Sequence, residues 1–148
     1  MNKKFLILLL FVLVGKLFAV DNFNHLKESI GLNSGGKAII FYQNLNDCFK
    51  CSIEMNNVVD LVEKGKNKNR NKIVCFVNCK RKKELDFFRK TNNWKHFLFI
   101  NKDQIQNILK SDLNTGMIIL DENFNVLSKL KYGEIIQNIK SINAILNN

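Results

Sequence analysis

The sequence contains no proline in 148 residues, and it has only one tryptophan and two histidines. Asparagine, lysine and isoleucine are abundant, so the lack of proline is a property of the whole chain and says little about any one position. His25 and His96 are isolated from each other and from the cysteines, and Trp94 precedes an apolar run, so we expect structural roles for all three. No phosphate-binding glycine loop, serine triad or paired-carboxylate motif is visible.

The composition predicts one packed globular domain. The chain is 46% hydrophobic and 24% charged, which is typical of folded proteins and argues against disorder. A length of 148 residues suits a single domain, and no internal repeat or low-complexity tract is present.

The N-terminus has the pattern of a signal peptide. Lys3 and Lys4 precede the apolar run Phe5–Val14, which is short for a membrane span and suits a signal-peptide core. We expect residues 1–19 to be a signal peptide that directs export, and residues 20–148 to be the mature domain. The alternative is an uncleaved anchor, which would tether the domain to the membrane.

The charge balance is basic, with a formal net charge of +10. Without Lys3, Lys4 and Lys16, 20 basic and 13 acidic residues remain. The lysines are scattered through the runs 64–72 and 80–83, which we interpret as a solvated loop and a solvated helix start. We therefore expect no nucleic-acid partner, because an exported protein rarely meets one.

Hydrophobic periodicity predicts alternating strands and helices. From Cys48 the apolar residues follow a helical period, with Cys51, Met55, Val58, Val59 and Val62 on one face, until Gly65 ends the helix. The expected strands are 37–42, 72–77, 96–100, 116–121 and 125–131, and the expected helices are 48–64, 80–93, 103–109 and 134–146. This order predicts an α/β fold with a central mixed sheet and helices on both faces.

A strand followed by C-x-x-C at a helix start, a second buried strand, and a terminal hairpin and helix resemble the thioredoxin-like fold over about residues 30 to 146. The exported TlpA-type thiol-disulfide oxidoreductases are the most similar subgroup. Their C-x-x-C-x-x-E motif matches Cys48, Cys51 and Glu54, and their hairpin motif matches IILDENFNV. Three positions depart from this family. Asp47 stands where the family usually has tryptophan, Asn56 where proline often kinks the first helix, and Thr115 where a cis-proline faces the cysteines.

The resemblance implies an exported enzyme that exchanges disulfides through Cys48 and Cys51. A helix N-terminus stabilises a thiolate, so Cys48 is the expected nucleophile, and Cys51 is the resolving thiol one turn later. Lys50 should favour the thiolate and Asp47 should oppose it. The expected partners are protein disulfides or thiol relay proteins, and no cofactor is expected.

Glu54 and the turn before the hairpin are further expected parts of the site. Related proteins have an acid at the position of Glu54 that relays a proton to the buried sulfur. The alternative is a first-turn glutamate that merely favours the helix dipole. Thr115 and Gly116 are expected to form the substrate-docking turn beside Cys48, where glycine permits a close backbone approach because it has no Cβ.

Cys75 and Cys79 have other expected roles. If residues 72–79 are all strand, the two Cα atoms are about 13 Å apart, too far for a disulfide. Cys75 is expected to be a core residue. Cys79 falls at the carboxyl end of its strand and is either a third redox thiol or an ordinary loop cysteine.

Two non-enzymatic functions stay open. The four cysteines have a spacing that permits zinc, although the strand around Cys75 argues against it, and copper binding is a variant of the same idea. The other alternative is a non-catalytic thioredoxin-like binding module in which C-x-x-C is a fixed disulfide.

Overall fold

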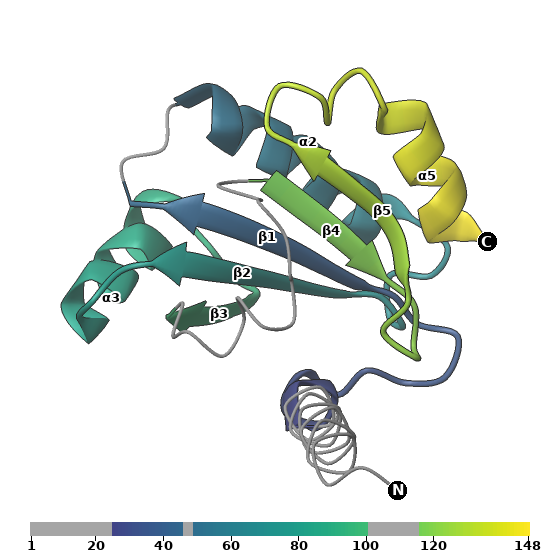
Figure 1. Ribbon diagram of the computed structural model, residues 1–148, viewed down its shortest axis with the longest axis horizontal. Helices are drawn as coiled ribbons and strands as arrows, with labels where there is room; N and C mark the ends of the chain where they lie inside the picture. The colour runs from purple at the N-terminus through teal and green to yellow at the C-terminus, as the bar shows by residue number, and fades with distance from the viewer. Residues whose placement is uncertain (1–24, 46–48, 101–115) are drawn as a thin grey trace, which may run out of the picture.

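The computed structural model describes residues 25–45, 49–100 and 116–148, and its centre is a mixed five-stranded sheet (Figure 1). The strands lie in the order β3-β2-β1-β4-β5. The first three strands of the chain run parallel, whereas β4 is antiparallel to β1, and β5 is antiparallel to β4. Their bounds are β1 Ala38–Asn44, β2 Lys72–Asn78, β3 Phe97–Ile100, β4 Gly116–Leu120 and β5 Val126–Lys131.

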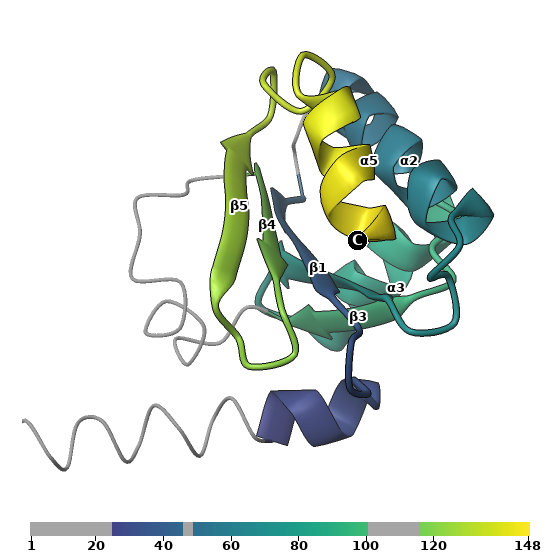
Figure 2. The ribbon, with the colours of Figure 1, turned by 90° about the vertical axis from the view of Figure 1, so that its right-hand side faces the viewer.

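Helices cover both faces of the sheet, as predicted (Figure 2). Helix α2 (Phe49–Lys64), α3 (Lys82–Thr91) and α5 (Ile139–Asn147) contribute to the core on one face. A helix of residues 25–30, which the sequence analysis did not predict, packs Leu26 and Ile30 against the other face. The expected helix at 103–109 lies outside the described residues.

Successive side chains along the strands point to opposite faces of the sheet, so the interior consists of two hydrophobic cores, one on each face. In β1, Ile39 and Phe41 face α2, while Ala38 and Ile40 face the helix of residues 25–30. All residues of β4 are buried, because side chains of a sheet covered on both faces have no solvent side. Met55, Val58 and Val62 are buried on the predicted face of α2, and α2 ends directly before Gly65 as expected.

The start of the C-terminal helix was predicted wrongly. The apolar period suggested a helix from residue 134, but residues 132–138 form turns and α5 begins at Ile139. Gly133 has φ +97°, which is left-handed backbone, and the side chain of Glu134 accepts the N–H of Lys131 at 2.9 Å. Ile135 is nevertheless fully buried, so the apolar pattern identified the buried residues although part of it lies on a turn.

A buried asparagine directly before β2, Asn71, makes hydrogen bonds that link the start of this strand to the C-terminal helix. Asn71 Oδ1 accepts the Lys37 N–H at 3.1 Å, and Asn71 Nδ2 donates to the Leu146 carbonyl at 3.2 Å. Because these groups are buried or partly buried, removing the amide leaves them poorly satisfied. We expect Asn71→Ala to lower the free energy of unfolding by about 1–3 kcal/mol in urea denaturation.

The matched control is Asn69→Ala, an exposed residue in the same loop, which should change stability by less than about 0.5 kcal/mol. Equal losses in the two variants would contradict the role given to Asn71.

The N-terminus of α3 depends on one carboxylate. Glu84 Oε2 accepts the backbone N–H groups of Lys80 at 2.9 Å and Arg81 at 3.2 Å. These two hydrogen bonds lower the pKa of Glu84. Because the folded-state pKa is depressed, the stabilisation is present above the unfolded-state pKa and is lost as the pH falls through the folded-state pKa.

We therefore expect the urea midpoint of the wild type to approach that of Glu84→Gln when the pH is lowered from 7 to 3, where the carboxylate becomes protonated. Asp86→Asn, an exposed acid of the same helix, is the control, and its difference from the wild type should change much less between pH 7 and pH 3. A constant gap between the wild type and Glu84→Gln across this range would show that Glu84 contributes no pH-dependent stability.

Candidate active site

The candidate site lies at the carboxyl ends of β1 and β2, where the chain enters α2. Asn44 and Asn78 are register partners at this end of the two strands, and Asn78 Nδ2 donates to Asn44 Oδ1 at 2.9 Å. Helix α2 begins at Phe49, five residues after β1 ends. The chain that follows β1 therefore leads into a helix whose first turn contains Cys51.

Cys51 lies in the first turn of α2 and is half-buried. Asp47, Cys48 and Thr115 lie outside the described residues. Lys50 belongs to α2, and its side chain likewise lies outside the described part of the chain.

Glu54 is buried beneath this helix start, with only 1% of its surface exposed. Its Oε2 accepts the backbone N–H of Gly133 at 2.6 Å, in the turn that follows β5. The first turn of α2 contains no acidic residue, so Glu54 is not the first-turn glutamate that the alternative interpretation required. It is a buried carboxylate one helical turn beyond Cys51, held by a backbone N–H of a neighbouring segment.

Gly133 and Gln43 are two site residues that the sequence analysis missed. Gln43 is 1% exposed and lies near the end of β1, where strand alternation places it on the same side as Ile39 and Phe41. A polar residue in an otherwise apolar strand was its only signal. For Gly133, the signal was a glycine directly after a strand, which here adopts φ +97° and presents its N–H to Glu54.

Gly116 opens β4 at the end of the sheet where β1 leads toward α2, and its role in a docking turn stays a prediction. It is the first residue of β4 and is the register partner of Tyr42 in β1 and of Lys131 in β5. The chain that precedes β4 therefore enters the sheet at the same end as Cys51. Within the described residues all peptide bonds are trans, and the bond before Thr115 lies outside them.

The remaining cysteines belong to the core on the α2 face. Cys75 is fully buried in β2, as predicted, and Cys79 is buried just beyond the strand. Burial raises the pKa of Cys79, the charge of Glu84 raises it further, and a hydrogen bond with the Arg81 backbone partly opposes both. Among the three described cysteines, no disulfide joins Cys51, Cys75 and Cys79. A raised pKa lowers the thiolate fraction of Cys79 and so disfavours it as a nucleophile.

Trp94, His96 and His25 have packing or polar partners of their own among the described residues. Trp94 is buried, with an edge-to-face contact to Phe41 at 6.2 Å and a hydrogen bond from Nε1 to the Phe97 carbonyl at 3.1 Å. His96 pairs with Glu63 at 3.1 Å, and His25 is exposed beside Ser29. The described ranges contain no group of three or more His, Cys, Asp or Glu residues arranged to hold a metal ion.

Comparisons with known proteins identify the fold. No family model matches the chain, and no curated protein matches it. The thioredoxin domain of a thiol-disulfide oxidoreductase from Bacteroides vulgatus matches with a TM-score of 0.58 over 77% of this chain and 81% of that chain, at 13% identity. The chain has a thioredoxin-like fold.

Two further solved structures agree with the thioredoxin-like assignment. StoA from Bacillus subtilis has a TM-score of 0.57 at 14% identity, over 74% of this chain and 84% of that one. A secreted disulfide oxidoreductase from Mycobacterium tuberculosis has a TM-score of 0.53 at 10% identity, over 78% and 85% of the two chains. In this thioredoxin-like chain α2 runs through Asn56 in a single helix of 16 residues, where the family often has a proline kink.

Proposed function

We propose that the protein is an exported thiol-disulfide oxidoreductase in which Cys48 is the nucleophile and Cys51 the resolving thiol. The observation that carries the proposal is Cys51 in the first turn of α2, at the carboxyl end of β1 in a thioredoxin-like sheet. Cys48 directly precedes Phe49, the first residue of this helix, and we propose that its thiol lies at the helix N-terminus. Unpaired N–H groups and the helix dipole stabilise a thiolate at such a position.

The proposed exchange has two steps. The Cys48 thiolate attacks one sulfur of a substrate disulfide, and the other substrate sulfur leaves as a thiolate. Cys51 then attacks the Cys48 sulfur and releases the second substrate sulfur, so that the protein becomes a disulfide. Two electrons have passed to the substrate, whose sulfurs take up two protons, and an external dithiol reverses the change in the protein.

Glu54 is the proposed proton carrier for Cys51. Its carboxyl group is buried one helical turn from the thiol, and the Gly133 N–H fixes one of its oxygens. The resolving thiol must lose its proton before it attacks, and a buried carboxylate is a suitable acceptor. Lys50 and Asp47 are proposed to tune the Cys48 thiolate with opposite signs. We assign Cys79 no step, because its thiol is buried and its pKa is raised.

Export is the second part of the proposal, and it rests on the signal-like N-terminus. The secreted disulfide oxidoreductase from Mycobacterium tuberculosis, which shares the fold, is an extracellular precedent. Within the described residues no helix is long and apolar enough to cross a membrane. Cell fractionation with mass measurement of the N-terminus tests both export and cleavage, and a cytoplasmic protein that begins at Met1 would contradict export.

Insulin reduction tests the enzymatic part. The full-length chain should accelerate the reduction of insulin by dithiothreitol, measured as turbidity from the released B chain. A rate equal to that of dithiothreitol alone would contradict the proposed activity and would favour a binding module with a fixed disulfide.

Thr115 provides a test of the proposed docking turn. Proline at this position, with a cis peptide bond, should hold an extended peptide more rigidly beside Cys48, since the ring fixes φ. We expect Thr115→Pro to increase the rate on insulin more than the rate on a small aromatic disulfide. The same change in both rates, or no change in a folded variant, would contradict the placement of this turn beside the thiols.

A further inference from the structure

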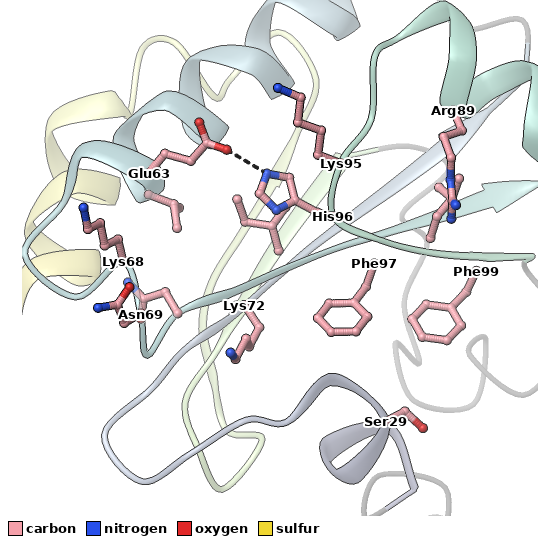
Figure 3. A pocket seen from close by; sticks show the side chains of 14 residues that line it. Ser29, Glu63, Lys68, Asn69, Lys72, Arg89, Lys95, His96, Phe97 and Phe99 are labelled. Carbon is pink, nitrogen blue, oxygen red and sulfur yellow. Dashed lines mark ion pairs between the residues drawn. The ribbon is translucent and has the colours of Figure 1, made fainter.

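A second candidate site lies beside the C-terminal end of α2, whereas Cys51 lies in the first turn of that helix. A cavity of about 750 Å³ opens between the C-terminal end of α2, the start of β2, β3 and the helix of residues 25–30 (Figure 3). Four basic side chains line it, and we call it the basic cavity. These side chains are Lys68, Lys72, Arg89 and Lys95.

The basic cavity is separate from the proposed exchange site. It contacts α2 at Val62 and Glu63, whereas Cys51 is in the first turn of the same helix. Eleven helical residues at 1.5 Å each place Val62 roughly 17 Å from Cys51 along the axis. The wall of the cavity at Val62 is therefore distinct from the thiol at Cys51, and the basic residues of the cavity suit another ligand.

The charge of the cavity is strongly unbalanced. Among the described residues that line it, Glu63 is the only carboxylate, and its Oε1 lies 3.1 Å from His96 Nε2. Figure 3 shows this pair on one side of β3, away from the rings of Phe97 and Phe99. The lining of the cavity thus contains four basic side chains and one acid that already has a partner, which favours an anionic ligand.

The wall of the cavity also has an apolar part. Phe97 is 39% exposed, which is unusual for so large an apolar side chain at the end of a strand. Phe99 lies beside it on the same side of β3 and stacks on Phe76 at 5.2 Å with an angle of 25° (Figure 3). Packing against Phe76 thus holds the Phe99 ring in place, while the Phe97 ring is exposed to the open volume.

We propose that the basic cavity binds an organic anion that has a phosphate or carboxylate group joined to an apolar group. Arginine and lysine bind the anionic oxygens, and Arg89 offers the planar donors that suit a phosphate. The two phenylalanine rings cover the apolar part. The volume lies within the range of cavities that hold small organic ligands.

Such an anion has two sources, a soluble metabolite or the headgroup of an anionic lipid. Ser29 lines the cavity, and eight residues lie between it and Val20, where the alternative anchor of residues 5–20 would end. That chain spans at most roughly 30 Å, so an anchored N-terminus would hold the cavity near a membrane surface. The lipid source rests on the proposed anchor, but the anion site itself does not.

Titration of the full-length chain with naphthyl phosphate tests the site by calorimetry and by amide chemical shifts. We expect saturable one-to-one binding that weakens with salt, with shifts centred on Lys72 and Phe97. Inorganic phosphate, which has no apolar group, should bind at least about tenfold more weakly, which corresponds to 1.4 kcal/mol. Equal affinity for the two anions, or no saturable binding, would overturn the proposal.

Matched variants separate the cavity from general surface charge. The double variant Lys72→Gln with Arg89→Gln should weaken naphthyl phosphate binding at least about tenfold. If this variant does not fold, the double variant Lys68→Gln with Lys95→Gln replaces it, because both of these lysines are exposed. Lys129→Gln with Lys131→Gln removes the same charge from β5, at the other edge of the sheet, and should leave affinity unchanged. Equal losses in cavity and control pairs would overturn the site.

Two further measurements identify the source and keep the site distinct from the exchange activity. Displacement of naphthyl phosphate by phosphatidylglycerol vesicles, but not by phosphatidylcholine vesicles, assigns the lipid source, and a lack of displacement by either assigns the soluble source. Cys48→Ser should bind naphthyl phosphate as the wild type does. A loss of binding in Cys48→Ser would overturn the separation of the two sites.

Discussion

Replacing Cys48 by serine is expected to reduce insulin reduction to the rate of dithiothreitol alone. The hydroxyl of serine is not ionised at neutral pH, even at a helix N-terminus, so no nucleophile would remain to attack the substrate disulfide. Cys51 cannot take over this role, because it lies within the first turn of α2 and is half-buried. The turbidity assay with purified, folded variants measures this loss.

Cys51→Ser should have a different effect, because the first step stays intact. The Cys48 thiolate still attacks, but the mixed disulfide has no resolving thiol and accumulates. Non-reducing electrophoresis should show this covalent complex with Cys51→Ser and not with Cys48→Ser. Cys79→Ala is the matched control and should keep most of the activity. Wild-type activity in Cys48→Ser, or trapped complexes in both variants, would contradict the assigned roles.

Replacing Glu54 by leucine is expected to lower both stability and activity. The Gly133 N–H would lose its acceptor in a partly buried position, at a cost of about 1–3 kcal/mol in the free energy of unfolding. Resolution by Cys51 should also slow, because the proposed proton acceptor is gone. Urea denaturation and single-turnover release of the mixed disulfide measure the two effects separately.

Glu54→Gln separates the structural role from the proton transfer. Glutamine keeps an oxygen that accepts the Gly133 N–H, so most of the stability should remain, but it cannot accept a proton from Cys51. We expect near-native unfolding with a slower release step and a changed pH–rate profile. A pH–rate profile identical to that of the wild type would show that Glu54 only holds the turn after β5.

Local patterns in the sequence predicted most of the sheet and the helix that carries the thiols. The apolar runs of β1, β2 and β4 are nearly continuous, since these strands are buried on both faces, and the helical period of Met55, Val58 and Val62 predicted the buried face of α2. The helix of residues 25–30 was missed because only two of its apolar residues, Leu26 and Ile30, follow the helical period. Two residues are too few to distinguish a short helix from a loop.

Features that depend on distant segments were not predictable in the same way. The acceptor role of Glu54 requires a glycine 79 positions later in the chain, which no spacing rule connects to C-x-x-C. The lysines of the run at 64–72 were interpreted as solvated, and only the fold brings Lys68 and Lys72 to the same cavity as Arg89. In α5 the period was correct, but the left-handed Gly133 moved the helix start to Ile139.

The redox state of the cysteine pair is the most direct test of the proposed function. The full-length chain is equilibrated in buffers of oxidised and reduced dithiothreitol and in buffers of oxidised and reduced glutathione, the free thiols are blocked, and the mass of the peptide that contains Cys48 and Cys51 is measured. The proposal predicts a reversible change of this peptide from two blocked thiols to an unblocked disulfide across one potential, while Cys75 and Cys79 stay thiols. A pair that stays oxidised, or stays reduced, in every buffer would contradict a redox enzyme.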